Sequence, residues 1–207
     1  MTLRAYERHA ADYGRGDNDR GWLVPVLDQF LAMVRPGGIV LDLGCGPGRE
    51  AFELAERGVR VVGLDIASSL LGRAHREHPV VGYVRGDMRQ LPFESESFDG
   101  VWAAASLHHL RPEEVRMSLA EVSRVLRPNG AFYSSVESGE TAGTTPPLPG
   151  DQVQSDRYYA FYSPGDWRQH VAAGGLVVES LNHAESDPTH LNVGATGWIE
   201  VFARRPR

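Results

Sequence analysis

The segment Val40-Leu41-Asp42-Leu43-Gly44-Cys45-Gly46-Pro47-Gly48-Arg49-Glu50 carries the strongest structural signal in the chain. It predicts a buried strand over residues 39–43, a turn with three alternate glycines, and a helix that begins near Pro47. Glycines lack a Cβ where the chain reverses, so a ligand can lie against bare backbone there. The helix N-terminus behind the turn presents unpaired N–H groups and a partial positive charge. The segment therefore predicts a ligand-binding turn at the end of a strand.

The composition is that of an ordinary globular domain. The chain has 207 residues, of which 42% are hydrophobic and 23% are charged, so it can bury a sizeable core within one domain. The net charge of −6 argues against a nucleic-acid-binding surface. All 21 basic residues are arginines. The absence of lysine excludes a Schiff base, an amine general base and a Walker-type phosphate lysine.

The cysteine content and the N-terminal sequence predict the compartment. Cys45 has no second cysteine with which to form an internal disulfide, and a reducing cytoplasm is its natural compartment. Residues 1–9 lack the apolar core of a signal peptide. No apolar run approaches the ~18 residues that span a bilayer. We therefore expect a soluble cytoplasmic protein.

Strands and helices alternate along most of the chain. Strands are expected over residues 39–43, 59–64, 80–84, 98–105 and 131–136, and helices over residues 6–13, 23–34, 47–57, 68–77 and 112–126. The strands are continuous apolar runs, which are typical of a parallel sheet covered by helices on both faces. Further on, Ser163 is expected to cap a helix that ends at Gly174-Gly175. The strand-like segments 176–181 and 198–203 predict a final antiparallel pair. The fold class is therefore α/β, Rossmann-like and doubly wound.

Three acidic residues fall at the expected carboxyl ends of strands, where such sheets bind ligands. Asp42 ends the first strand and Asp65 the second, where a carboxylate can accept both hydroxyls of a ribose. Asp87, in Gly86-Asp87-Met88, can accept a hydrogen bond from an adenine amino group, while Met88 offers the ring an apolar contact. Asp65 would serve an NAD enzyme equally well, so this acid alone does not choose the cofactor.

The residues around the turn narrow the choice of cofactor. A dinucleotide fingerprint has glycine where Arg49 stands, and the Gly-Lys-Ser/Thr of a phosphate loop is absent. A turn beside a carboxylate suits a nucleoside with a positively charged amino-acid tail better than a pyrophosphate. Asp99, at the start of the fourth strand, is expected to be structural.

These motifs together resemble the class I S-adenosylmethionine-dependent methyltransferases, in the branch that includes the ubiquinone/menaquinone-type enzymes. The matching segments are Val40 to Gly48, Val62-Gly63-Leu64-Asp65, Gly86-Asp87-Met88 with Leu91-Pro92-Phe93, Phe98-Asp99-Gly100-Val101 with Leu107-His108-His109-Leu110, and Leu126-Arg127-Pro128-Asn129-Gly130-Ala131. The resemblance covers about residues 36–137. It implies a seven-stranded, mostly parallel sheet with an antiparallel last strand, and S-adenosyl-L-methionine as cofactor.

The resemblance also implies roles for individual residues. The methionine part of the cofactor would lie against Asp42, Gly44, Cys45, Gly46 and Gly48. The ribose would lie against Asp65 with Ile66 beside it, the adenine against Asp87 and Met88, and the sulfonium side against the backbone near Ala104. Tyr13 resembles the aromatic lid over the cofactor. No metal ligands are predicted.

The chain is expected to form a single domain over residues 1–207. Within it we expect an N-terminal helical lid (1–35), a cofactor-binding core (36–137), a substrate loop or lid (138–170) and C-terminal strands (171–207). The acceptor would be a small molecule enclosed by residues of the first and third segments, with no nucleic acid as partner. Neither its identity nor the methylated atom, O, N or C, is readable, and both a monomer and a homodimer remain open.

The chemistry of methyl transfer needs little from the protein beyond alignment, because the cofactor is already activated. A general base is needed only where the acceptor must lose a proton. His108 is the best-placed candidate for a base, whereas His109 matches a position that is often a packed structural histidine. Two other functions stay open: an NAD(P)-dependent oxidoreductase, and a non-catalytic protein that binds S-adenosylmethionine.

Overall fold

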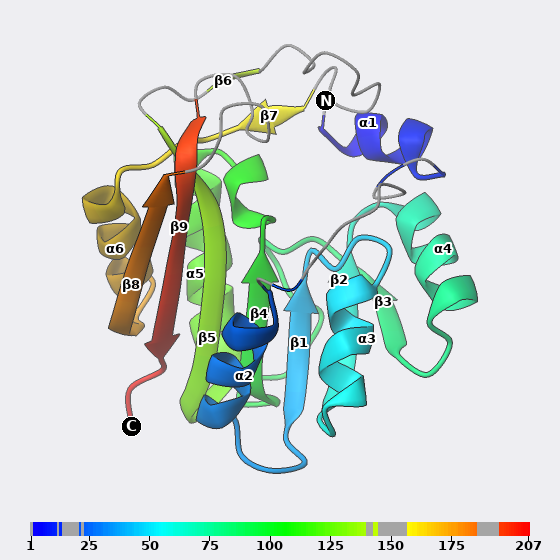
Figure 1. Cartoon of the computed structure of the whole chain (residues 1–207), viewed down its shortest axis with the longest axis horizontal. Coiled ribbons are helices and arrows are strands. Elements are labelled where there is room, and N and C mark those ends of the chain that lie inside the picture. The colour runs from blue at the N-terminus through cyan, green and yellow to red at the C-terminus, as the bar shows by residue number, and fades with distance from the viewer. Residues whose placement is uncertain are drawn as a thin grey trace.

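A seven-stranded sheet forms the centre of the molecule, in the order β3-β2-β1-β4-β5-β9-β8 (Figure 1). The computed structural model describes residues 2–11, 13, 21, 23–139, 143–144, 157–185 and 195–207. The strands of this sheet are β1 (Ile39–Leu43), β2 (Arg60–Asp65), β3 (Gly82–Arg85), β4 (Phe98–Ala104), β5 (Leu126–Gly139), β8 (Val177–Glu185) and β9 (Ala195–Arg204), and a separate pair joins β6 (Gly143–Thr144) to β7 (Tyr158–Tyr159). The helices are α1 (Thr2–His9), α2 (Leu23–Met33), α3 (Arg49–Glu56), α4 (Ser68–Glu77), α5 (Pro112–Val125) and α6 (Pro164–Ala173), with a short 3₁₀ turn η1 (Leu107–His109).

The strand directions confirm the predicted topology. Strands β3, β2, β1, β4 and β5 are parallel, whereas β9 runs antiparallel to both β5 and β8. The chain moves outward from β1 to β2 and β3, then crosses back to β4 on the other side of β1. The switch point therefore lies between β1 and β4, the place where open parallel sheets bind ligands.

Two apolar clusters cover the two faces of the sheet. Alternate strand residues point to opposite faces, so Val40, Trp102 and Tyr133 pack with α2 and α3. Their neighbours Leu41, Val101 and Phe132 pack with α5 and α6. The ring of Trp102 stacks on that of Tyr133 with centroids 4.0 Å apart. The central strands β1 and β4 are thus buried on both sides, as their continuous apolar sequences predict, whereas the edge strands β3 and β8 are more exposed.

Asp99 has the structural role expected of it. Its carboxylate accepts hydrogen bonds from Arg35 Nε at 2.6 Å, Ile39 N at 2.8 Å and Arg127 Nη1 at 2.7 Å. Burial raises its pKa, but the bonds from Arg35, Ile39 and Arg127 outweigh burial and hold the pKa at about 2. The carboxylate therefore ties together the starts of β1 and β4.

The N-terminal helix differs from the expectation of a helix over residues 6–13. Helix α1 begins at Thr2 and ends at His9, and Tyr13 lies in a turn. The cause is a tertiary contact, because the carbonyl groups of Ala10 and Tyr13 accept hydrogen bonds from Arg73 on α4. Of the expected substrate loop, residues 140–142 and 145–156 lie outside the described part of the chain.

The later strands are longer than expected: β5 spans Leu126–Gly139 instead of 131–136, because pairing with β4 and β9 extends it at both ends, and β8 and β9 extend beyond the expected 176–181 and 198–203. Ser163 caps α6 by accepting from Asp166 N at 3.1 Å, as predicted.

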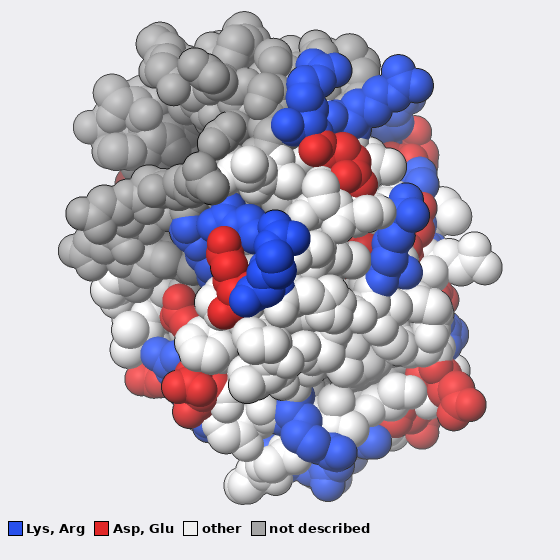
Figure 2. Space-filling view, turned by 90° about the vertical axis from the view of Figure 1, so that its right-hand side faces the viewer, with Lys and Arg blue, Asp and Glu red and all other residues white. Residues whose placement is uncertain are grey.

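In the described part of the chain, no helix combines the length and apolar character needed to cross a membrane. On the face shown in Figure 2, basic and acidic groups alternate in small groups without forming a continuous basic stripe.

Candidate functional site

The turn after β1 has the conformation that its glycines predict. Gly44, Gly46 and Gly48 have φ values of +80°, +51° and +81°, in the left-handed region that favours glycine. The backbone N–H groups of Gly44 and Cys45 both donate to Leu64 O on β2, at 2.8 and 3.0 Å. The turn is thus held against the end of β2, and α3 begins directly behind it at Arg49.

Two neighbouring side chains explain why glycine is required at both ends of the turn. A Cβ on Gly44 would lie 2.5 Å from Ser106 Cβ, and a Cβ on Gly48 would lie 2.4 Å from Tyr83 Oη. Real Cβ atoms do not approach other atoms so closely, so an alanine at either position would force a rearrangement. Tyr83 also fills the space beside Gly63, its partner on β2. Tyr83 was not identified from the sequence. The feature that could have identified it is the pairing of a glycine, Gly63, with an aromatic residue on the next strand.

Asp65 connects the glycine turn to helix α4. Its Oδ2 accepts from Gly46 N at 2.9 Å and its Oδ1 accepts from Ala67 N at 2.8 Å. Burial raises the pKa of this carboxyl, while the N–H groups of Ala67 and Gly46 act in the opposite direction. Ile66 follows at 36% exposure, and its carbonyl accepts from Arg85 Nε at 3.3 Å. Asp65 thus lies at the end of β2, where the sequence predicts an acid, and its contact with a ribose stays a prediction.

Asp42 lies between the turn and the two neighbouring strands. It is 3% exposed and pairs in the sheet with Gly63 on β2 and Trp102 on β4. Burial, followed by the negative charge of Asp42, raises the pKa of the Cys45 thiol well above its ordinary value. Cys45 is therefore held as a neutral thiol and is not an activated nucleophile.

The end of β4 faces the turn from the other side of the switch point. Ala104 is half-buried there, and Ala105 has an unusual φ of +48°. Ala105 N donates to the backbone oxygen of Ser135 at 3.1 Å and to its Oγ at 3.0 Å. Such strained positions persist only where surrounding contacts hold them, and they cluster at functional sites.

At the expected adenine end of the site, Met88 lies beside the glycine turn and Asp87 pairs with Arg89. Met88 Cε lies 3.4 Å from the Cβ position of Gly44. Arg89 donates to Asp87 through Nε at 2.9 Å and Nη2 at 2.5 Å, and also contacts Glu114. The bond from the Arg89 side chain is the largest influence that lowers the pKa of Asp87. Asp87 thus stays a charged acceptor, and its contact with adenine stays a prediction.

Tyr13 lies over the glycine turn, as expected for the aromatic lid. Its Cε1 is 3.8 Å from the Cβ position of Gly46. The Tyr13 ring packs edge-on against Tyr6 of α1, with centroids 5.3 Å apart. Arg73, which is 8% exposed, holds this end of the chain by its bonds to the carbonyls of Ala10 and Tyr13. Neither Tyr6 nor Arg73 stands out in the sequence, because both act through residues about 60 or more positions away.

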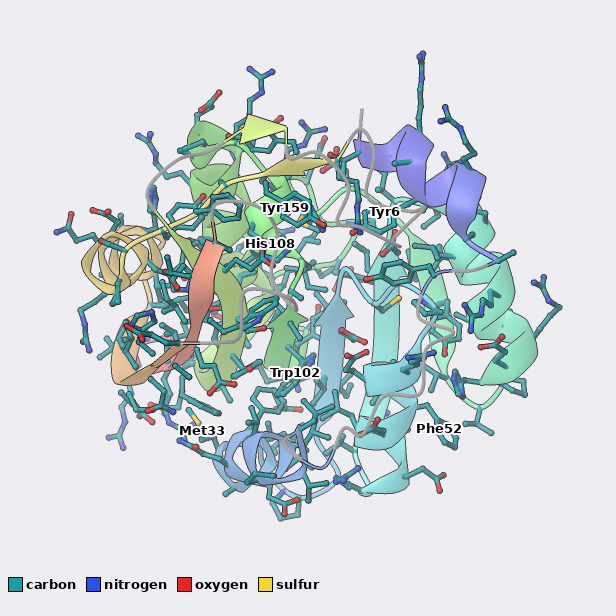
Figure 3. The ribbon with its side chains drawn as sticks, turned by 45° about the horizontal axis from the view of Figure 1, so that its top comes forward. Tyr6, Met33, Phe52, Trp102, His108 and Tyr159 are labelled. Atoms are coloured by element: carbon teal, nitrogen blue, oxygen red, sulfur yellow. The ribbon has the colours of Figure 1, made fainter. Side chains whose placement is uncertain are left out.

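His108, which is labelled in Figure 3, is 2% exposed, whereas its neighbour His109 is half-buried, and the two rings differ in their contacts. His109 Nδ1 lies 3.0 Å from Tyr158 O, a carbonyl that can only accept, so Nδ1 carries the proton. Its Nε2 therefore accepts from Tyr6 Oη at 2.7 Å. Burial lowers the pKa of His109 to about 4; the bond to the Tyr158 carbonyl acts in the opposite direction, and the charge of Arg157 adds a smaller lowering effect. His109 is thus neutral and structural, as predicted.

His108 has the opposite tautomer. Its Nδ1 accepts from Glu137 N at 3.3 Å, so the proton of the neutral ring is on Nε2. Burial, followed by the effects of His109 and Arg157, lowers the pKa of His108 well below its ordinary value. In this arrangement the ring offers a donor and not a base. The role predicted for His108 as a base remains a prediction that the hydrogen bonding disfavours.

Comparison with known proteins agrees with this geometry. A model of the methyltransferase domain family matches residues 40–130. A demethylmenaquinone methyltransferase of Beutenbergia cavernae is 38% identical over 191 residues, which make up 90% of this chain and 75% of that protein. The chain belongs to the class I S-adenosylmethionine-dependent methyltransferases. The family resemblance and the expected cofactor are thereby confirmed, and an NAD(P)-dependent oxidoreductase is disfavoured.

One further relative is matched over only about half of its length. An uncharacterized methyltransferase of Synechocystis sp. is 41% identical over 99 residues, and the chain covers 47% of its length. Among solved structures, 1,6-didemethyltoxoflavin-N1-methyltransferase of Burkholderia thailandensis, with 1,6-didemethyltoxoflavin and S-adenosylhomocysteine bound, has a TM-score of 0.74 at 22% identity, covering 99% of this chain and 87% of that one. The [4+2]-cyclase SpnF also has a TM-score of 0.74, at 18% identity, covering 100% and 97% of the two chains. At these identities the likeness shows the fold alone.

Proposed function

We propose that this protein transfers a methyl group from S-adenosylmethionine to a small metabolite. The observation that carries the proposal is the link between the turn and Asp65. Three glycines with positive φ form a cradle that side chains would fill, and Gly46 N bonds directly to the carboxylate of Asp65. This arrangement fits a ligand with a ribose at one end and an amino-acid tail at the other.

The proposed cofactor site uses the residues predicted from the sequence. Asp42 and the turn formed by Gly44, Cys45, Gly46 and Gly48 would hold the methionine part, with Tyr13 above. Asp65 and Ile66 would hold the ribose, Asp87 and Met88 the adenine, and the backbone of Ala104 would close the sulfonium side. The bound cofactor supplies an activated methyl group, so these residues need only align it and exclude water.

The proposed acceptor end lies where aromatic rings gather between α1, η1 and β7. In Figure 3, His108 and Tyr159 lie together near the end of β4, and Tyr6 faces them from α1. The guanidinium of Arg157 lies 5.2 Å from the centroid of the Tyr6 ring and 5.5 Å from that of Tyr159. These side chains form a largely buried cluster, which suits a flat or apolar small molecule better than a polymer. The names of relatives, such as demethylmenaquinone methyltransferase, also support a small acceptor.

The remaining expectations are part of the same proposal. We take residues 1–207 as a single methyltransferase domain, with residues 1–35 as the lid, 36–137 as the cofactor-binding core, 138–170 as the acceptor segment and 171–207 as the C-terminal strands. A cytoplasmic location suits the neutral buried thiol of Cys45. The mixed charges in Figure 2 and the net charge of −6 favour a partner other than nucleic acid.

A labelling experiment tests the proposal. The protein is incubated with methyl-tritiated S-adenosylmethionine and a cell extract that has been separated into small-molecule and macromolecular fractions. We expect label in a product of the small-molecule fraction, and much less label with the Asp65→Ala variant when the cofactor concentration is limiting. Label only in the macromolecular fraction would refute a small acceptor. Binding of S-adenosylhomocysteine without any transfer would favour the non-catalytic alternative.

A further inference from the structure

Two carboxylates share the N-terminus of helix α4. Ala67 N donates to Asp65 Oδ1 at 2.8 Å, while Ser68 N and Ser69 N donate to the Oε1 and Oε2 of Glu7 at 2.6 and 3.0 Å. The first N–H groups of a helix lack partners within the helix, and a carboxylate is among their best acceptors. Glu7 belongs to α1, so one helix is capped by a residue of another.

The contact between α1 and α4 is reciprocal. Arg73 of α4 donates to the carbonyl groups of Ala10 and Tyr13, which follow the end of α1. Ala10, Ala67 and Leu70 form a small buried apolar cluster between the two helices. Figure 1 shows α1 lying above α4 at the same edge of the molecule. An acid of α1 that bonds to α4, and an arginine of α4 that bonds to the residues after α1, thus fix the position of α1 on α4.

The same contact bears directly on Asp65. The bonds of Asp65 to Ala67 N and Gly46 N mean that any shift of the first turn of α4 moves Asp65 relative to the glycine turn. Burial is the main cause of the raised pKa of Asp65, and the negative charge of Glu7 adds a small further rise. The two carboxyl groups therefore interact electrostatically. Hydrogen bonding from Ser69, and then from the Ser68 backbone, lowers the pKa of Glu7 itself. Glu7 is therefore ionised at neutral pH.

We propose that Glu7 is a positioning residue for the cofactor. By capping α4 it fixes the turn that presents Asp65 to the ribose, and it makes the docked lid a part of the cofactor site. Glu7 does not contact the cofactor in this proposal and acts through Asp65. The inference rests on the assignment of Asp65 to the ribose.

Calorimetric titration with S-adenosylhomocysteine tests this role in matched variants. Glu7→Gln keeps the shape of the side chain but removes its charge and one acceptor oxygen, and Glu7→Asp keeps the charge on a shorter side chain. Arg8→Ala, at an exposed position of the same helix, is the control. Since a lost cap of this kind changes an equilibrium by about three- to tenfold, we expect Kd to rise by that factor in Glu7→Gln. Glu7→Asp should fall between Glu7→Gln and wild type, and Arg8→Ala should bind as wild type does.

A double-mutant cycle separates positioning from a general loss of stability. In an Asp65→Asn background, Glu7→Gln should change Kd by less than about twofold, because the carboxylate that it positions is gone. Equal effects of Glu7→Gln in both backgrounds, wild-type affinity in Glu7→Gln, or an equal loss in Arg8→Ala would each overturn the inference. If Asp65→Asn itself binds S-adenosylhomocysteine as wild type does, the ribose assignment fails as well. If Asp65→Asn weakens binding and Glu7→Gln does not, only the role of Glu7 fails.

Discussion

A methyl group added at Gly46 should block the cofactor with little other damage. Gly46 has a φ of +51°, and its nearest neighbour to a new Cβ is Tyr13 Cε1 at 3.8 Å, so the folded chain has room for alanine. Gly37 is a matched control, with a φ of +65° and nothing within 4 Å of a new Cβ. An alanine in this left-handed region costs roughly 1–2 kcal/mol. Each variant should therefore lower the unfolding temperature by about 2–8 °C.

The two variants should differ in ligand binding. If the cofactor lies on bare backbone at Gly46, the new methyl group overpacks the site, which typically costs about 1–3 kcal/mol. We expect the Kd of S-adenosylhomocysteine to rise at least about fivefold in Gly46→Ala, and to stay at the wild-type value in Gly37→Ala. Calorimetric titration measures Kd, and differential scanning fluorimetry measures the unfolding temperature. Wild-type affinity in Gly46→Ala, or an equal loss in Gly37→Ala, would refute the reasoning.

Three further predictions concern Asp65, His108 and His109. Asp65→Ala should weaken S-adenosylhomocysteine binding by about 1–3 kcal/mol, because ribose hydroxyls would be left unpaired, and unchanged affinity in a titration would show that another group holds the ribose. His108→Gln should lower kcat by less than about tenfold, since loss of a true base costs ~10²–10⁴-fold, and a fall of that larger size at unchanged KM would restore His108 as the base. The pKa of His109 is about 4 in the folded chain, against an ordinary value of 6.5, so the unfolded chain binds the proton first as the pH falls. The stability contribution of a neutral His109 is complete above pH 6.5 and is lost between pH 6.5 and about 4, by up to ~3 kcal/mol. Denaturant unfolding across this range should show a shallower pH dependence in His109→Gln, and an identical slope would contradict the shifted pKa.

The local structure of the chain was largely readable from its sequence. Strand β1 and helix α4 have the predicted bounds, because an apolar run that meets glycine and a helix bounded by polar residues are local signals. The cap on α6 was likewise written in Ser163-Pro164-Gly165-Asp166. The end of α1 was predicted wrongly, since Arg73, a residue of a distant helix, holds the carbonyls of Ala10 and Tyr13.

In the candidate site, too, some residues could be predicted from the sequence and others could not. Asp42, Asp65 and the glycine turn could be predicted because each is set by its own strand and the residues beside it. The bond from Ser68 N to Glu7 and the bond from Tyr6 to His109 join residues 61 or more positions apart, and no pattern in the sequence indicates them. The tautomer of His108 likewise depends on a backbone N–H of β5. The contacts that hold the site residues in place can therefore be recognised only in the three-dimensional structure.

A crystal structure of this protein with S-adenosylhomocysteine tests the central claim most directly. We expect the amino-acid tail of the ligand against the backbone of Gly44, Gly46 and Gly48, with both ribose hydroxyls donating to the carboxylate of Asp65. A ligand bound with its ribose away from Asp65, or with its tail away from the glycine turn, would contradict the proposed site.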